Sequence, residues 1–236
     1  MQKSILFVLG ILILSLPFLA FDCSSTELTS AKLYIQQKNW DRALEVLQAE
    51  VQKNPKSDEG YYLLGTVYSE LDQPEKTLEA FDNSLAISDK YSKNIKEYRT
   101  YHWAEYFNRG VSLFQRGSKT ADKDSTKMYY DMSIEAYHNA IMFQPDSGET
   151  YRNLAFVYLT TGQTEASVEP LKKLIELENA EEGYQYLGEV YYSLGAEIMN
   201  NFKSNSNSAD SVKAMEYFNS AIMTLDEGLA KYPDNT

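Results

Sequence analysis

Apolar and aromatic residues recur at intervals of three and four along most of the chain, and polar residues fill the positions between them. This spacing puts the apolar side chains on one face of a helix, so each stretch predicts an amphipathic α-helix that needs a partner to cover that face. Short turn sequences separate the stretches, for example at residues 72–74 and 161–163. The pattern predicts an all-α chain of paired helices.

One motif of large and small residues recurs within this pattern. Residues 61–68 read Tyr-x2-Leu-Gly-x2-Tyr, residues 184–191 repeat the motif, and residues 151–158 repeat it with alanine in place of glycine. The small residue lets two helices approach closely, while the large residues form one buried stripe. The first unit keeps the same period, because Tyr34 precedes Tyr68 by 34 residues. The motif and its period resemble the tetratricopeptide repeat, W-x2-L-G-x2-Y followed by A-x3-F and a closing Pro.

The resemblance covers almost all of the chain from residue 23 onward. It implies a right-handed α-solenoid of about five helix-turn-helix repeats, in which neighbouring repeats stack and none is stable alone. The expected repeats span about residues 24–57, 58–91, 92–147, 148–180 and 181–236.

Two units are longer than the others. Gly110 to Pro145 spans 35 residues and Gly188 to Pro233 spans 45, whereas the equivalent interval in the first unit spans 24. The excess of 11 and 21 residues predicts lengthened hairpins in the third and fifth repeats. The turn-rich segments 117–125 and 200–211 are the expected exposed tips of these hairpins.

The first 22 residues are typical of a secretory signal. Lys3 precedes an apolar run over residues 5–19, which is shorter than the roughly 20 residues of a comfortable membrane span. The single cysteine, Cys23, lies directly behind this run, as in bacterial lipoproteins, and is a lipidation candidate. Three alternatives stay open: a lipid on Cys23, ordinary cleavage near Ala20, or an uncleaved anchor. In the first two the protein is exported, either into the periplasm or as a lipoprotein facing the periplasm or the surface.

The charge balance excludes one class of partner. The chain has 22 Lys and Arg against 34 Asp and Glu, and its cations are scattered. Nucleic-acid binding requires clustered cations that neutralise phosphates. We therefore expect no nucleic-acid partner.

Catalytic and cofactor motifs are missing from the sequence. Its two histidines, His102 and His138, are far apart, and the chain has neither a metal-binding His or Cys spacing nor a glycine-rich phosphate loop. We therefore expect no cofactor, no metal and no enzymatic activity.

The resemblance also implies where a partner would bind, namely the concave groove lined by the first helix of each repeat. In the family, an asparagine two residues before the motif's small residue often contacts a bound peptide backbone, and Asn108 and Asn153 occupy that place. Helical spacing adds further groove residues: Tyr62, Thr66, Phe107, Val111, Arg152, Phe156, Gln185, Glu189 and Tyr192.

Two functions follow as hypotheses. The first is a non-catalytic scaffold of the bacterial cell envelope that binds protein or peptide partners in this groove. The alternative is a small-ligand or glycan binding protein that uses the dense aromatic stretch over residues 98–107, with a closed pocket near Trp103.

Overall fold

The computed structural model describes residues 25–205 and 207–233, which form helices joined by short turns. The part of the chain that it describes contains no strand. The elements in chain order are α2 (Thr26–Gln36), α3 (Trp40–Lys53), α4 (Asp58–Glu70), α5 (Pro74–Ile87), α6 (Ser92–Lys119), α7 (Lys123–Phe143), α8 (Gly148–Thr160), η1 (Glu165–Ser167), α9 (Val168–Glu178), α10 (Glu181–Asn205) and α11 (Ser208–Lys231).

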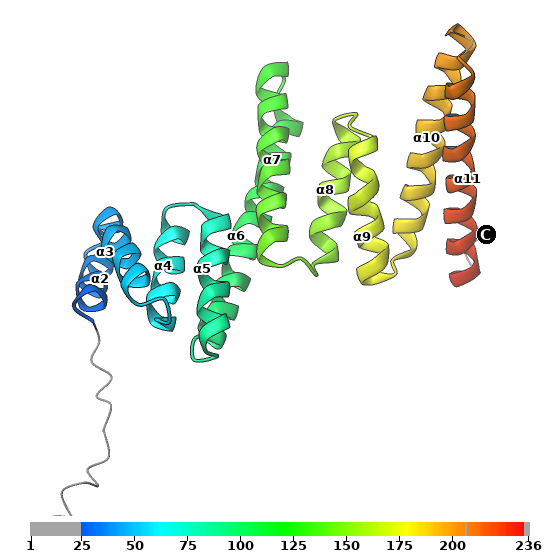
Figure 1. Ribbon diagram of the computed structural model, residues 1–236. Helices are drawn as coiled ribbons and strands as arrows, with labels where there is room; N and C mark the ends of the chain where they lie inside the picture. The colour runs from blue at the N-terminus through cyan, green and yellow to red at the C-terminus, as the bar shows by residue number, and fades with distance from the viewer. Residues whose placement is uncertain (1–24, 206, 234–236) are drawn as a thin grey trace, which may run out of the picture.

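The helices form five antiparallel pairs that follow one another in chain order. Figure 1 shows α2 and α3 at one end of the array and α10 and α11 at the other. Within the array, α3 contacts α4, α7 contacts α8, and α9 contacts α10, so each of these pairs packs against the next. The all-α solenoid predicted from the sequence is confirmed.

Helix starts are fixed by capping residues. The side-chain oxygens of Ser25, Ser57 and Ser147 each accept a hydrogen bond from the backbone N–H three residues later, at the starts of α2, α4 and α8. Such caps satisfy donors that have no partner within the helix. Pro74 is the first residue of α5, where its missing N–H costs nothing. The pairs therefore begin where the sequence places its turns.

The turns inside three of the pairs share one backbone conformation. Lys38, Asp72 and Gly162 have positive φ angles of 54°, 53° and 73°. Each lies seven residues after the small residue at the centre of its unit. A left-handed residue reverses the chain between two helices, and glycine adopts it without strain. The same turn therefore recurs although only one unit supplies glycine.

Close contact at a glycine holds three of the five pairs together. A Cβ atom at Gly65 would lie 2.5 Å from Phe81 Cδ1 and 3.1 Å from the Thr77 carbonyl oxygen, so only glycine fits there. The Phe81 side chain is fully buried against it. Equivalent contacts occur in the third and fifth pairs. The three contacts join Gly65 to Phe81, Gly110 to Tyr137 and Gly188 to Leu225, which lie 16, 27 and 37 residues apart.

The longer separations show where the extra residues lie. They exceed the 16 residues of the second pair by 11 and 21, the excess expected from the sequence for the third and fifth units. Helices α10 and α11 have 25 and 24 residues, whereas α4 and α5 have 13 and 14. The insertions therefore lengthen both helices of a hairpin beyond the contact that sets its register.

The hairpin tips are shorter than predicted. Instead of turns over residues 117–125 and 200–211, α6 continues to Lys119, α7 begins at Lys123, and α10 and α11 are separated only near residue 206. The added helical turns pack against each other. A Cβ atom at Gly195 on α10 would lie 2.8 Å from the Phe218 ring on α11. Tertiary packing of two facing helices thus outweighs the turn preference of Ser and Asn.

We predict that Gly65→Ala destabilises the protein, although alanine is the better helix former by about 1 kcal/mol. Its methyl group would meet Phe81 and the Thr77 carbonyl, and overpacking of this kind typically costs about 1–3 kcal/mol. The measurement is urea unfolding followed by circular dichroism. Ser193→Ala, at an exposed position of α10, is the control and should be neutral or slightly stabilising. Equal stability of the two variants would contradict the close-contact explanation.

Candidate functional site

The predicted groove residues on α4 are engaged inside the array. The Tyr62 ring stacks on Tyr91, with ring centroids 4.4 Å apart, and also contacts Phe81 and Tyr98. Thr66 is buried, and its hydroxyl donates to the Tyr62 carbonyl. Burial raises the pKa of Tyr62. These rings join α4 and α5 to α6, so this end of the predicted groove is filled by the protein's own side chains.

The aromatic stretch of α6 also has structural partners. The indole Nε1 of Trp103 donates to the Thr150 Oγ1 at 3.0 Å, and Thr150 is fully buried. Phe107 is half-buried between the rings of Trp103 and Tyr137. Trp103 therefore links α6 to α8, and its polar atom is already used within the fold.

Unlike these rings, the side-chain amides of Asn108 and Asn153 are not used in hydrogen bonds or ring contacts among the described residues. Asn108 is exposed on α6 and Asn153 is half-buried on α8. In the described part of the chain, neither side-chain amide makes a hydrogen bond to another residue. Both hold the same place relative to Gly110 and Ala155. Two consecutive first helices thus present an amide that can donate to and accept from a ligand.

Apolar surface accompanies these two amides. Phe156 on α8 is 55% exposed, and its ring lies 5.4 Å from that of Phe114 in an edge-to-face contact. Val111 is half-buried and packs in the same cluster as Phe114. A large ring held in one orientation but left open to solvent can receive an apolar side chain of a partner.

Arg152 is not free to bind an anion. Its Nη2 lies 2.7 Å from the Glu178 Oε2, and its Nε donates to Glu182. The guanidinium therefore joins α8 to the end of α9 and the start of α10. A terminal carboxylate of a ligand would have to compete with two carboxylates of the protein.

The predicted residues on α10 are exposed. The Gln185 Nε2 donates to the Glu189 Oε1 at 3.2 Å, one turn apart. Tyr192 is 63% exposed, and its ring lies 5.7 Å from that of Phe218 on α11. Together with Gly188 and Leu225, Glu189 and these two rings line an apolar hollow of about 510 Å³ at the end of the array.

One arrangement of polar groups was not foreseen from the sequence. The Ser69 Oγ lies 2.5 Å from the His102 Nε2, and the His102 Nδ1 lies 3.0 Å from the Glu105 Oε2. A Ser-His-Glu order is also that of acyl-transfer relays, which need N–H donors for an oxyanion. Ser69 instead lies in the last turn of α4, where carbonyl groups are left free. The arrangement is better explained as a polar link between α4 and α6.

The histidine side chains make structural contacts. The His102 ring also lies against Tyr101 and Phe143. His138 is hydrogen bonded through its Nε2 to the Tyr158 hydroxyl at 2.9 Å, and burial lowers the pKa of the imidazole. Within the described residues, no group of three His, Cys, Asp or Glu side chains could hold a metal ion.

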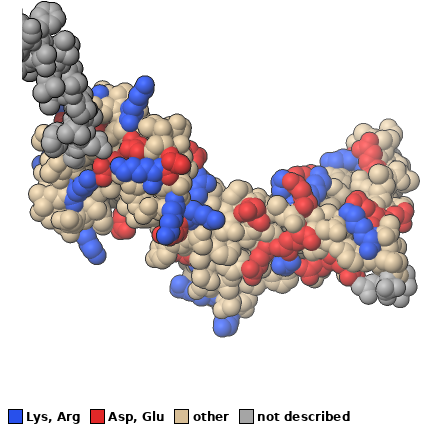
Figure 2. Space-filling model, turned by 90° about the horizontal axis from the view of Figure 1, so that it is seen from below, with Lys and Arg blue, Asp and Glu red and all other residues tan. Residues whose placement is uncertain are grey.

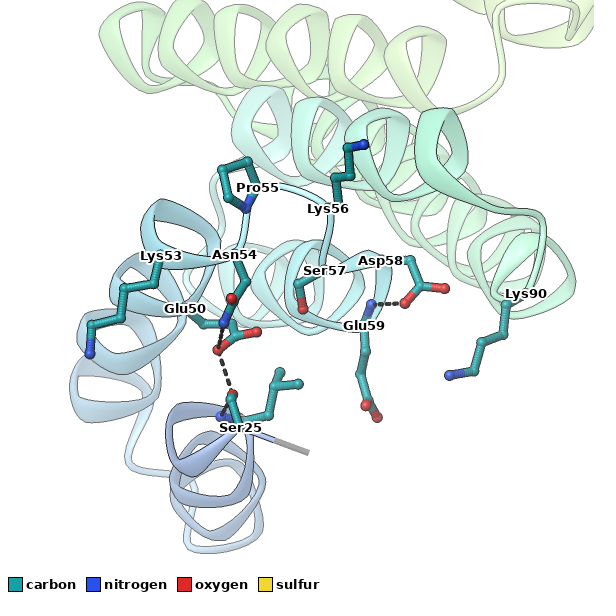
Figure 3. A pocket seen from close by; sticks show the side chains of 11 residues that line it. Ser25, Glu50, Lys53, Asn54, Pro55, Lys56, Ser57, Asp58, Glu59 and Lys90 are labelled. Atoms are coloured by element: carbon teal, nitrogen blue, oxygen red, sulfur yellow. Dashed lines mark hydrogen bonds between the residues drawn. The ribbon is translucent and has the colours of Figure 1, made fainter. Parts of the chain in front are cut away.

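A polar cavity of about 660 Å³ lies at the N-terminal end, between the starts of α2 and α4 (Figure 3). On one side, the carboxylate of Glu50, which is only 1% exposed, accepts hydrogen bonds from Ser25 Oγ at 2.5 Å and Asn54 Nδ2 at 3.2 Å. Asp58, Glu59 and Lys90 lie on the opposite side. The buried carboxylate therefore fixes the entry of the chain into the first pair.

The charged lining of this cavity is largely paired. Lys53 binds Glu27, and the Lys32 Nζ lies 2.8 Å from the Glu59 Oε1. Small-molecule pockets are typically apolar with a few convergent polar groups. The mixed and paired charges here favour a structural role for the cavity.

Charge is unevenly distributed along the array. Residues 25–119 contain 13 Lys and Arg against 14 Asp and Glu, whereas residues 120–233 contain 8 against 18. In Figure 2, blue side chains are frequent towards the N-terminal end of the visible face, and several red patches lie along the middle and the C-terminal end. The C-terminal half thus carries nearly all of the negative net charge.

The family comparison agrees with the helix pairs. Residues 27–57, which cover α2, α3 and the turn after them, match the tetratricopeptide repeat model. The chain carries a tetratricopeptide repeat. A TPR repeat-containing protein of Methanocaldococcus jannaschii is 22% identical over 89% of this chain, and the chain spans 42% of that relative's length.

Solved tetratricopeptide structures are also similar. A thermophilic TPR protein of Thermus thermophilus is 18% identical, covers 84% of this chain and 97% of its own, and gives a TM-score of 0.36. YrrB, described as a TPR protein with an unusual peptide-binding site, is 13% identical with coverages of 89% and 86% and a TM-score of 0.32. At these TM-scores neither structure locates a binding site on this helical array.

The residues named for export lie largely outside the described part. Residues 1–22 and Cys23 precede the first described residue, Ser25, so the signal and the lipidation candidate stay predictions. Among the described helices, none has the length and hydropathy that a membrane span requires.

We predict that Trp103→Phe destabilises the solenoid by about 1–3 kcal/mol, because the buried Thr150 hydroxyl loses the donor that it accepts from. Unfolding in urea measures this loss. Trp40→Phe is the matched control, because no hydrogen bond is made by the Trp40 indole nitrogen among the described residues. If Trp103→Phe leaves the stability unchanged, a ligand-binding role of Trp103 would instead be favoured.

Proposed function

We propose that this protein is a non-catalytic scaffold of the bacterial cell envelope that binds extended segments of partner proteins along its first helices. The tetratricopeptide fold supports a role in protein–protein interaction. The observation that carries the proposal is the pair of side-chain amides at Asn108 and Asn153, both without a hydrogen-bond partner among the described residues.

An extended peptide fits these amides for a chemical reason. Its backbone has N–H and C=O groups that need partners, and a side-chain amide offers both a donor and an acceptor. Such contacts hold a segment of almost any sequence. Phe156, exposed on the same helix as Asn153, would add selectivity by contacting an apolar side chain of that segment.

The charge distribution supports a basic partner segment. The groove residues Asn153 and Phe156 lie on α8, in the half of the chain where 18 acidic residues face 8 basic ones. A segment with Lys or Arg beside an apolar anchor would be attracted to this half and would associate faster at low salt.

The same distribution supports attachment at the N-terminal end. A lipid on Cys23 would lie two residues before Ser25, the cap of the first helix, and would hold the first repeat next to the membrane. The nearly neutral half would then lie close to anionic headgroups and the acidic half away from them, which reduces electrostatic repulsion.

We expect Asn108→Ala with Asn153→Ala to weaken peptide binding at least about tenfold, since two backbone contacts are lost, while leaving the unfolding midpoint unchanged. The probe is a set of peptides selected against the full protein from an unbiased library, and affinity is measured by fluorescence anisotropy. Asn83→Ala, an exposed amide on α5, is the control. If the double variant binds the selected peptides as tightly as the Asn83→Ala control, these amides do not form the site.

The lipid attachment is tested with Cys23→Ala in a bacterial host, followed by partitioning between detergent and aqueous phases. We expect the native protein in the detergent phase and Cys23→Ala in the aqueous phase, because a diacyl anchor dominates partitioning. Ser24→Ala serves as the control and should partition like the native protein. A Cys23→Ala protein that stays in the detergent phase would show that residues 1–22 act as an uncleaved anchor.

A further inference from the structure

The last helix pair exposes a long apolar face. Tyr192 on α10 and Val212, Met215, Ile222 and Leu229 on α11 are 63%, 61%, 50%, 58% and 47% exposed. On α11 these four positions follow a helical stripe, opposite Lys213 and Tyr217, which face α9. Single exposed apolar residues are normal on a protein surface, but several along one face of a helix pair indicate an interaction site.

Repeat register shows what normally covers this face. Ile222 and Leu229 lie three residues before and four residues after Leu225, the residue that packs on the motif glycine. The same two positions in the fourth unit are Val168 and Ile175, which pack against the cluster of α10. In the first unit the equivalent residues are Leu44 and Val51, which pack in one cluster with the buried Leu64 and Val67 of α4. In the third unit they are Ile134 and Ile141, which pack with the buried Leu154 and Val157 of α8.

The covering helices share a spacing of their own. Helix α10 covers the fourth unit with Leu187, Val190 and Leu194, and its Gly183 lies so close to Ile175 that a Cβ there would meet the Cγ1 at 2.8 Å. Helix α4 repeats this spacing with Gly60, Leu64 and Val67, followed by Leu71 directly after its last residue. Helix α8 repeats the central Leu and Val. We call the exposed apolar face of α10 and α11 the end face. A helix that fits it would therefore carry the sequence pattern small-x3-Leu-x2-Val-x3-Leu.

Helix α2 does not fit the end face of a second copy. Its positions equivalent to Leu187, Val190 and Leu194 are Ser30, Leu33 and Gln37, so the face that would stack on α11 is largely polar. Head-to-tail stacking of two chains would bury these polar groups against Ile222 and Leu229 at a cost. The outward face of α2 is thus largely polar, whereas that of α10 and α11 is apolar.

The charges around the exposed face of α10 and α11 indicate the sign of the charge on its binding partner. Glu189 lines the apolar hollow between α10 and α11, and Asp226 lies on the exposed stripe between Ile222 and Leu229. Two copies that met through this face would bring these acidic groups together, which costs free energy. A helix with Lys or Arg beside its apolar stripe would neutralise them.

We propose that the end face of α10 and α11 binds an amphipathic helix of another protein, which docks where the first helix of a sixth repeat would lie. The helix has an apolar stripe with the spacing above and basic residues on its flanks. This site lies at the end of the array, apart from Asn108 and Asn153, so the array binds one helical and one extended segment.

The test uses the full protein and a helical peptide of about 20 residues that carries Gly-x3-Leu-x2-Val-x3-Leu, with Lys and Ala at the other positions. We expect binding with one peptide per protein and at least about tenfold weaker binding to Ile222→Glu with Leu229→Glu. Leu33→Glu is the matched control, because Leu33 is 52% exposed at the opposite end. It should bind the peptide like the native protein.

Charge selectivity is tested with a peptide in which every Lys is replaced by Glu. Native protein should prefer the Lys peptide, and Glu189→Lys with Asp226→Lys should reverse this preference. Equal binding of both peptides, or weakening by Leu33→Glu, would overturn the proposal. So would sedimentation that shows a dimer lost in Ile222→Glu, because the occupant would then be a second copy. These readouts are independent of Asn108 and Asn153, so each site is judged separately.

Discussion

The close contact between a small residue on one helix and a large side chain on the next sets the geometry of every other part of this protein. At Gly65 the helices approach until a single methyl group would overlap both the Phe81 ring and a backbone carbonyl. Dispersion contacts decline steeply with distance, so a pair held this closely has one register that packs best. The same contact at Gly110 and Gly188 keeps that register although 11 and 21 residues have been inserted between the partners.

A fixed register makes the faces of the helix pairs equivalent from one repeat to the next. Once Phe81, Tyr137 or Leu225 is placed, the residues three before and four after it must point towards the following pair. The chain meets this requirement with Leu, Ile or Val in every unit, including the last. The asparagines of α6 and α8 are equivalent for the same reason. Both proposed surfaces are therefore consequences of one packing constraint repeated along the chain.

The sequence predicts those features that depend on contacts within a repeat. The helix pairs, their order and the two lengthened units follow from the spacing of tyrosine, leucine and glycine. It does not predict contacts between repeats, such as Ser69 with His102 or Trp103 with Thr150. These join residues 33 and 47 positions apart, and their formation depends on how two pairs are placed. The hairpin tips were also missed, because facing helices supply packing that local turn preferences do not reveal.

The junction between the second and third pairs shows how the solenoid accommodates an irregular step. Helix α6 begins 18 residues before Gly110, whereas α4, α8 and α10 begin seven before their own small residue. Its added turns pack through large rings: the Tyr98 ring lies 5.6 Å from that of Phe81, and Ile95 is 1% exposed. Large rings span a wider gap than Leu and Val do. At this junction they take the place of the Leu and Val side chains that cover the other pairs. Tyr62, expected in the groove, is used here instead. The groove that stays open therefore begins after this junction, at Asn108 on α6, and continues into the acidic half of the chain with Asn153 on α8.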